Sequence, residues 1–286
     1  MLAVPSGRVS IVTALLTPFD EDREIDHDAL REHVDDLISD GVDGIMPCGT
    51  SGEGPLLSET EAAAVIRTVV EAAAGRVPVL AHVGRAATRE TVRLGGKATD
   101  AGATALTACV PYYYALEERQ IVDHYTTLMA STKTPVYAYT IPSRTGNELS
   151  SDAVRALATA GLAGIKDSTK SFEQHLEYLE VARAVADSDG FAVFMGSDTM
   201  VLDAFEAGAA GSVTALANLR PDLLASLKKA FIAGEKAEAK TLQQEITRVR
   251  SEVSGGPALS GLKAAVACRL SAKGIAYPAG LRAPLG

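Results

Sequence analysis

Short apolar stretches alternate with longer amphipathic stretches from one end of the chain to the other. The short stretches are rich in β-branched residues and are typical of strands buried on both faces, whereas the longer ones have the apolar period of helices. Eight such alternations predict eight parallel strands, each followed by a helix. The strands are expected at 10–16, 44–48, 79–83, 105–110, 136–140, 164–166, 192–195 and 211–214.

The expected helix boundaries repeat along the chain. Ser58 and Ser171 each stand three residues before a Glu or Gln, which is the capping-box spacing at the start of a helix. Before every second strand a glycine able to adopt the left-handed conformation ends the helix. These glycines are Gly41, Gly102, Gly161 and Gly208. Their repetition indicates a single eightfold design.

Eight strand–helix units predict a (β/α)8 TIM barrel. The last barrel helix should end near Gly234, so we expect residues 1–234 to form a catalytic barrel. Residues 235–286 should then form a small C-terminal helical extension packed on the barrel, with helices over 235–253 and 259–273. A doubly wound sheet is the alternative fold, but the first strand–helix turn lacks the G-x-G-x-x-G sequence of its dinucleotide-binding form.

Composition narrows the classes of function. The 286 residues include 27 Lys and Arg against 36 Asp and Glu, which gives a formal net charge of −9. Nucleic acid is therefore not an expected partner, because neutralising phosphates requires clustered cations. No apolar stretch of about 18 residues and no signal segment is present, so neither membrane insertion nor secretion is predicted. Three widely spaced cysteines suggest neither a disulfide framework nor a thiolate zinc site, and we expect a cytoplasmic protein.

Candidate chemistry lies directly after the strands, because a TIM barrel builds its active site at their carboxyl ends. Lys166 ends the sixth strand, where partial desolvation favours a neutral amine able to form a Schiff base with a ketone. An ion pair with Asp167 or with a neighbouring carboxylate is the alternative. Thr50 and Ser51 lie in a glycine-flanked loop after the second strand, which suits an anion such as a carboxylate as well as an ordinary turn.

The exits of the fourth and fifth strands carry further candidates. Tyr139 lies near the expected barrel mouth, where its hydroxyl can relay protons, although a core role is the alternative. Arg144 can hold a carboxylate through its planar guanidinium. Three adjacent aromatics at 112–114 suit either catalysis or a subunit contact. The five histidines show no H-x-H or H-x-x-H spacing, so no metal site is predicted.

Four motifs in this order resemble the dihydrodipicolinate synthase and N-acetylneuraminate lyase family of class I aldolases, over nearly the whole chain. The motifs are GTSGE at 49–53 followed by Leu57-Ser58, PYY at 111–113, YTIPSRTG at 139–146 and GIKD at 164–167. Their joint order and spacing are far more specific than any one of them.

The resemblance implies a mechanism without a cofactor. Lys166 would form an imine with pyruvate or another 2-oxo acid, and Tyr139 would be the acid/base group beside it. Thr50 and Ser51 would bind the carboxylate, and Thr50 would also link Tyr139 to Tyr113 in a proton relay. In relatives the tyrosine that matches Tyr113 crosses from a neighbouring subunit, which implies a homotetramer built from tight dimers.

The resemblance also implies which residues bind the second substrate. Arg144 matches the arginine that the synthase branch uses to hold a distal carboxylate. Gly196 and Val213 match positions that line the exits of the seventh and eighth strands.

Departures from the synthase pattern bear on the substrate. That branch has two threonines, Asn, Glu-Ala and Gly-Asp-Asp where this chain has Thr50-Ser51, Thr140, Asp167-Ser168 and Gly196-Ser197-Asp198. These changes favour an aldolase or lyase acting on a 2-oxo-3-deoxy sugar acid or 4-hydroxy-2-oxoglutarate. Arg144 instead favours 4-hydroxy-tetrahydrodipicolinate synthase, which condenses pyruvate with aspartate semialdehyde. A catalytically silent barrel that binds an oxo acid as a sensor is the alternative from another class, but such descendants usually lose the lysine or the tyrosine.

Overall fold

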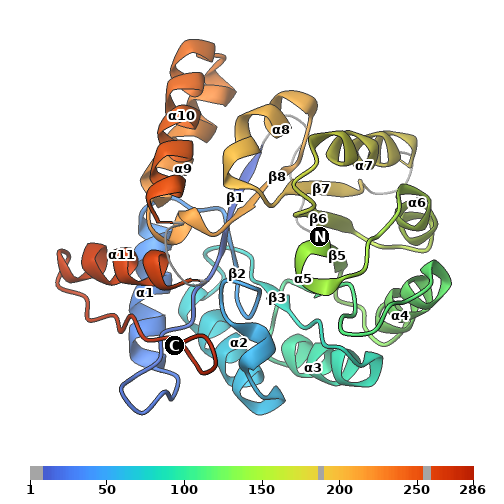
Figure 1. Cartoon of the computed structure of the whole chain (residues 1–286), viewed down its shortest axis with the longest axis horizontal. Coiled ribbons are helices and arrows are strands. Elements are labelled where there is room, and N and C mark those ends of the chain that lie inside the picture. The colour runs from blue at the N-terminus through green and yellow to red at the C-terminus, as the bar shows by residue number, and fades with distance from the viewer. Residues whose placement is uncertain (1–8, 186–189, 254–258) are drawn as a thin grey trace.

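Eight parallel strands form the centre of the computed structural model, which describes residues 9–185, 190–253 and 259–286 (Figure 1). Each strand is short and buried. The strands are β1 Ser10–Ala14, β2 Gly44–Met46, β3 Leu80–His82, β4 Ala105–Cys109, β5 Val136–Thr140, β6 Gly164–Asp167, β7 Ala192–Met195 and β8 Gly211–Thr214. Residues 1–8, where the sequence shows no signal segment, lie outside the described residues.

The strands pair in the order β2-β1-β8-β7-β6-β5-β4-β3, and all the pairs are parallel. An isolated parallel bridge between Ile45 and Val79 joins the two ends of this sheet. There the Ile45 N–H donates to the carbonyl oxygen of Pro78 at 3.0 Å. The strands therefore enclose a barrel, and the TIM-barrel prediction is confirmed.

Helices surround the barrel and bury one apolar face each against the strands (Figure 1). One of these helices lies in each connection between consecutive strands, and one more follows the last strand. These helices are α1 His27–Ser39, α2 Glu59–Ala73, α3 Thr88–Asp100, α4 Glu118–Ala130, α6 Ser151–Thr159, α7 Phe172–Ala184, α8 Val201–Ala207 and α9 Pro221–Ala233.

The predicted helix boundaries agree with the structure in most details. Ser58 and Glu61 form both hydrogen bonds of a capping box. Ser171 accepts from the Gln174 N–H at 3.2 Å, but the Gln174 side chain donates to Ser151 instead of completing a box. The four predicted glycines all adopt positive φ, from 90° to 104°. They are Gly41, Gly102, Gly161 and Gly208.

Several strand ends differ from the expected ones. β2 stops at Met46 because the chain turns at Cys48, whose φ is 61°. β6 instead continues through Asp167. After β5 the chain forms a short helix, α5 Pro142–Thr145, which the apolar pattern did not predict. Pro142 starts it, since proline fits the first turn of a helix.

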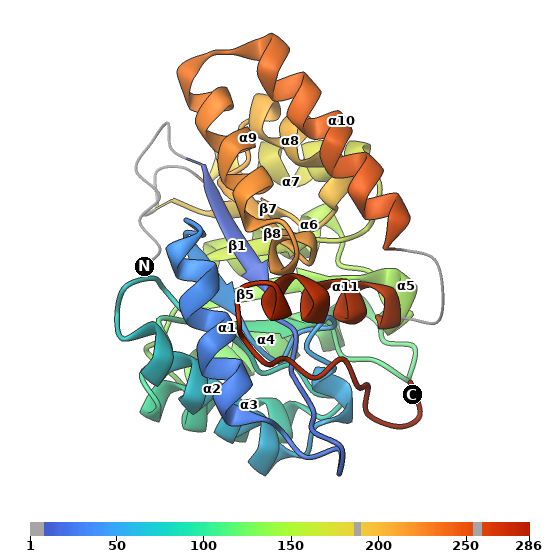
Figure 2. The ribbon, with the colours of Figure 1, turned by 90° about the vertical axis from the view of Figure 1, so that its left-hand side faces the viewer.

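The two further helices predicted after Gly234 are present as α10 Lys236–Glu252 and α11 Ser260–Ser271. They share an apolar core with the barrel, in which Ile11 of β1 lies with Ile246 of α10 and Val266 of α11. Figure 2 shows α11 lying beside α1 and the tail after it running along the barrel. None of the described helices is both long and apolar enough to cross a membrane.

Candidate active site

A cavity of about 760 Å³ opens at the carboxyl ends of the strands. Its lining includes all but one of the residues to which the family resemblance assigns a role. These are Thr50, Ser51, Tyr139, Arg144, Lys166, Gly196 and Val213. The exception is Tyr113, which does not line this cavity.

Lys166 lies in the cavity floor. On β6 it pairs with Tyr139 of β5 on one side and Phe194 of β7 on the other. Its Nζ lies 4.0 Å from the Met46 Sδ and 4.1 Å from the centre of the Tyr139 ring. Only 6% of the residue is exposed. The amine therefore ends against a thioether and the face of an aromatic ring.

Asp167, the alternative partner of Lys166, bonds elsewhere. Its Oδ2 lies 2.9 Å from the His175 Nδ1, and its Oδ1 accepts from the Thr169 N–H and hydroxyl at 2.9 and 2.7 Å. Successive side chains of a strand point to opposite faces, so Lys166 and Asp167 diverge. In the part of the chain that the structure describes, no carboxylate lies within ion-pair distance of the Lys166 Nζ. The predicted alternative of an ion pair between these two residues is wrong.

Tyr139 connects the lysine to the loop after β2. Its hydroxyl lies 3.2 Å from the Thr50 Oγ1, within hydrogen-bond distance. The His82 and Tyr139 rings pack edge to face, with their centres 5.8 Å apart. Burial, together with the positive charge of Lys166, lowers the pKa of His82 to about 3. His82 is therefore a neutral packing partner of the tyrosine.

The loop at 49–54 holds Thr50 and Ser51 at the cavity. A Cβ at Gly52 would lie 2.7 Å from the Leu15 carbonyl oxygen, and one at Gly54 would lie 1.8 Å from that of Cys48. The loop is also bonded to the barrel, because the Thr17 hydroxyl donates to the Gly52 carbonyl at 2.7 Å. Only glycine fits these close approaches, and the tight packing fixes the path of the backbone.

The exits of β7 and β8 form another part of the cavity wall. The Gly196 N–H donates to the Asp167 carbonyl at 2.6 Å, which brings the ends of β6 and β7 close together. Asp198 is buried next to Gly196, and burial raises the pKa of its carboxyl against the opposing effect of Arg250. The Arg250 Nε lies 3.1 Å from the Asp198 Oδ2.

The C-terminal extension supplies a further wall that the sequence did not predict. Arg250 of α10, Leu262 of α11 and Leu285 of the tail all line the cavity. No motif marks these residues. Their apolar neighbours indicate that the extension is buried, but periodicity does not say against which face of the barrel.

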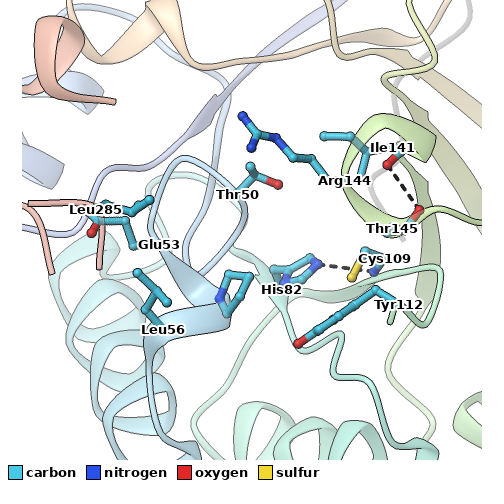
Figure 3. Close-up of a pocket in the computed structure, with 11 residues that line it drawn as sticks. Thr50, Glu53, Leu56, His82, Cys109, Tyr112, Ile141, Arg144, Thr145 and Leu285 are labelled. Atoms are coloured by element: carbon cyan, nitrogen blue, oxygen red, sulfur yellow. Dashed lines mark hydrogen bonds between the residues drawn. The ribbon is translucent and has the colours of Figure 1, made fainter. Parts of the chain in front are cut away.

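A second cavity, of about 270 Å³, is drawn in Figure 3. Its lining and that of the first cavity share Thr50, Ile141, Arg144 and Leu285. His82, Cys109 and Tyr112 also line the second cavity. Burial raises the pKa of the Cys109 thiol to about 12, so Cys109 is not an activated nucleophile.

Tyr113 lies next to Tyr112 in sequence but on the surface. It is 86% exposed, and its ring packs edge to face on Tyr114, which is 72% exposed. Its φ of 84° is rare for a residue with a side chain.

The described residues contain no cluster of three or more His, Cys, Asp or Glu side chains that could hold a metal ion.

Comparison with known proteins agrees with this geometry. Residues 8–286 match the dihydrodipicolinate synthetase family. The chain is 37% identical to an uncharacterised DapA-like lyase of Halobacterium salinarum, over 98% of this chain and 89% of that protein. It is 38% identical to a 4-hydroxy-tetrahydrodipicolinate synthase of Anaeromyxobacter, over 90% and 85% of the two chains.

Among solved structures it resembles YagE of Escherichia coli K12, a prophage protein of the dihydrodipicolinic acid synthase family solved in complex with pyruvate. The TM-score is 0.91 at 27% identity, over 97% of this chain and 92% of that one. The cavity, the lysine on β6 and the match along nearly the whole sequence lead to one conclusion. The chain belongs to the dihydrodipicolinate synthetase family and is a lyase of aldolase type.

Proposed function

We propose that the protein is a class I aldolase in which Lys166 forms an imine with pyruvate or another 2-oxo acid. The environment of the Lys166 Nζ carries this proposal: a thioether and an aromatic face surround it, and its neighbour Asp167 bonds to His175 instead. The Lys166 amine lies at the floor of the cavity and is not paired with a carboxylate of the described residues, so it is positioned to attack a ketone carbon.

The reaction follows from the positions of these groups. The neutral amine attacks the ketone carbon, and the ketone oxygen leaves as water when the imine forms. In cleavage the bond between carbons 3 and 4 breaks, and its electron pair moves to the imine nitrogen to give an enamine. The proton of the carbon-4 hydroxyl leaves at the same time, and carbon 4 becomes an aldehyde. Carbon 3 then takes a proton, and water hydrolyses the imine to release pyruvate; synthesis is the reverse.

Tyr139 is the proposed proton carrier for these steps. Its ring lies 4.1 Å from the Lys166 Nζ, and its hydroxyl is 3.2 Å from that of Thr50. A hydroxyl in this position can pass protons between the reacting carbons and a hydrogen-bonded chain. Thr50 and Ser51, on the rigid loop beside it, are the proposed binding site of the 2-oxo acid carboxylate.

The cavity walls favour a hydroxylated, anionic substrate, with Gly196 and Val213 lining the space for it. Hydroxyl side chains line the wall at Ser168, Ser197 and Thr199, while Arg144 and Lys170 add positive charge. We infer that a 2-oxo-3-deoxy sugar acid or 4-hydroxy-2-oxoglutarate is the substrate cleaved or made. The second candidate, condensation of pyruvate with aspartate semialdehyde, is supported by Arg144 at the rim and by the synthases among the relatives.

We further propose a cytoplasmic homotetramer built from tight dimers. Two adjacent tyrosines exposed by 86% and 72% form an apolar surface typical of a subunit contact. In such a dimer Tyr113 would reach the Thr50 hydroxyl of the neighbouring subunit and complete the relay.

The imine is tested directly by adding pyruvate and borohydride and locating the adduct by peptide mass spectrometry. We expect a stable adduct on Lys166, and none in a folded Lys166→Ala variant. A wild-type protein left unmodified at Lys166 would contradict the proposal.

Substrate assays then separate the candidates. Cleavage of a 2-oxo-3-deoxy sugar acid or of 4-hydroxy-2-oxoglutarate to pyruvate supports the first candidate, and consumption of aspartate semialdehyde with pyruvate supports the second. An adduct on Lys166 without turnover of any substrate would instead indicate an oxo-acid sensor.

A further inference from the structure

We propose that the buried ion pair between Glu53 and Lys263 positions the loop at 49–54 for the 2-oxo acid carboxylate. The C-terminal helix α11 thereby takes part in substrate binding without touching the substrate. Glu53 and Lys263 are positioning residues, and this role rests on the proposed function of Thr50 and Ser51.

Glu53 lies in the same loop as those two side chains. Its backbone is left-handed, with φ 55° and ψ 28°, although it is not a glycine. Such a conformation persists only where the surroundings hold it in place. In Figure 3 Glu53 lies beside Leu285 of the tail and apart from Arg144.

Two C-terminal segments converge on the Glu53 carboxylate. The Lys263 Nζ of α11 lies 2.6 Å from the Glu53 Oε1, and the Arg282 N–H of the tail donates to Oε2 at 2.9 Å. Lys263 also donates to the Gly280 carbonyl at 2.7 Å and lies 4.4 Å from the centre of the Phe19 ring. Neither charged side chain is exposed to solvent.

Burial of both charges argues for a role beyond stability. A buried ion pair is a weak source of stability, since desolvation opposes the attraction, but its hydrogen bonds define one geometry. Burial lowers the pKa of Lys263, and the adjacent Glu53 carboxylate opposes that effect. The pair therefore fixes the relative position of the loop and α11.

The consequence for catalysis follows from how the loop is attached. On the barrel side the carbonyl oxygens of Gly52 and Gly54 accept from Thr17 and Arg85 at 2.7 and 2.6 Å. The Glu53 side chain, between these two bonds, ties the loop to the C-terminal region. Loss of that ion pair should displace Thr50 and Ser51 and weaken binding, because the groups of a binding site must be held to within about 0.5 Å.

The test measures borohydride trapping of pyruvate on Lys166 as a function of pyruvate concentration. In Lys263→Met we expect the concentration for half-maximal trapping to rise about tenfold, with the same extent of trapping at saturation. The matched control is Lys273→Met. Lys273 follows α11 and pairs with Asp36 of α1 and with Asp40 just after that helix, at 2.6 and 2.8 Å, rather than with the loop. The half-saturating concentration of Lys273→Met should therefore stay at the wild-type value.

A double variant, Glu53→Gln with Lys263→Met, separates positioning from folding. Removing both charges should restore much of the stability that Lys263→Met loses, while half-saturation stays raised. Three results would overturn the proposal. The double variant could regain the wild-type half-saturating concentration together with its stability, Lys263→Met could leave that concentration unchanged, or Lys273→Met could raise it as much as Lys263→Met does. If Lys263→Met does not fold, Glu53→Gln and the double variant provide the same comparison.

Hydrogen exchange of the amides at 49–54 gives a readout that does not depend on the reaction. We expect faster exchange in Lys263→Met than in Lys273→Met. Equal exchange would reject the positioning role. Absence of any adduct on Lys166 in the wild-type protein would instead reject the proposed function, so the two failures are distinguishable.

Discussion

Two buried lysines in this molecule lie against aromatic rings but differ in their partners. Lys263 is 2.6 Å from a carboxylate oxygen of Glu53, whereas Lys166 contacts the Met46 sulfur and the Tyr139 ring. Lys263 is therefore held in a buried ion pair, whereas no carboxylate of the described residues is paired with the Lys166 amine, which faces the cavity. The partners of both lysines come from elements that are distant in sequence, so the sequence alone does not distinguish the two environments.

His33 makes the stability of the protein depend on pH. It is fully buried, its Nε2 lies 3.1 Å from the Asn218 Oδ1, and burial lowers its pKa from 6.5 to about 4. The folded state disfavours the protonated ring, so the stability it contributes is present above pH 6.5 and lost as the pH falls toward 4. Between pH 7.5 and 5.5 we expect the free energy of unfolding to fall by about 1.3 kcal/mol through this residue alone.

Urea unfolding of the wild type and of His33→Gln at both pH values measures this contribution. The fall in stability should be smaller in the variant by about that amount. His82 and His124, with pKa values lowered to about 3 and about 4, act in the same direction, so a pH dependence remains in the variant. Identical pH dependence in both proteins would show that His33 is not the cause.

At the scale of elements, features that depend on residues close together in sequence could be predicted, whereas contacts between distant residues could not. The glycine at Gly161 and the capping residue Ser58 were recognisable because turn and cap chemistry involves only near neighbours in sequence. The pair of Glu53 and Lys263, 210 residues apart, was not, since nothing in a periodic pattern states which elements meet. The exits of the strands could be identified because the barrel repeats its connections, but the wall that α10 and α11 add to the cavity could not.

Gly196 shows how closely two strand exits approach one another. A Cβ there would lie 2.6 Å from the Asp167 carbonyl oxygen and 2.0 Å from the Ser168 hydroxyl oxygen. We expect Gly196→Ala to lower the free energy of unfolding by about 2 kcal/mol, because the backbone of β6 must shift. The shift should also move Lys166, which lies in the same strand, and slow the trapping of pyruvate.

Gly96→Ala is the matched control for that substitution. Gly96 lies within α3, and a Cβ added there would meet no atom within 4 Å apart from its chain neighbours and the backbone of its own helix. This variant should gain up to about 1 kcal/mol, since alanine favours the helix, and should trap pyruvate at the wild-type rate. The two variants are compared by chemical unfolding and by the rate of adduct formation. A Gly196→Ala protein as stable and as fast as Gly96→Ala would contradict the role of the close approach.

For the whole molecule, charge is distributed unevenly between surface and cavity. The chain carries a net charge of −9, yet Arg144, Lys166, Lys170 and Arg250 line the cavity with Asp198 as the acidic residue among its described lining. The proposed oxo-acid substrate would therefore meet a locally positive site on a protein whose net charge disfavours polyanions. The sequence predicted Lys166 and Arg144 in this role from their places after strands, but Arg250 belongs to the extension and was missed.

The proposed dimer makes a prediction that depends on the assembly as a whole. If Tyr113 acts in the neighbouring subunit, Lys166→Ala and Tyr113→Phe should each impair the homodimer, the first completely and the second strongly. In a hybrid dimer the subunit with Tyr113→Phe keeps its own Lys166 and receives Tyr113 from its partner, so that one site is complete.

Mixing the two variants under conditions that exchange subunits should therefore restore activity. With equal amounts, half of the dimers are hybrids with one complete site in two, so about a quarter of the wild-type activity is expected. The assay is pyruvate release or consumption before and after exchange, with the dimer checked by light scattering. Activity that merely averages the two variants would mean that Tyr113 acts within its own subunit or not at all, and its exposed ring would then serve only the contact between subunits.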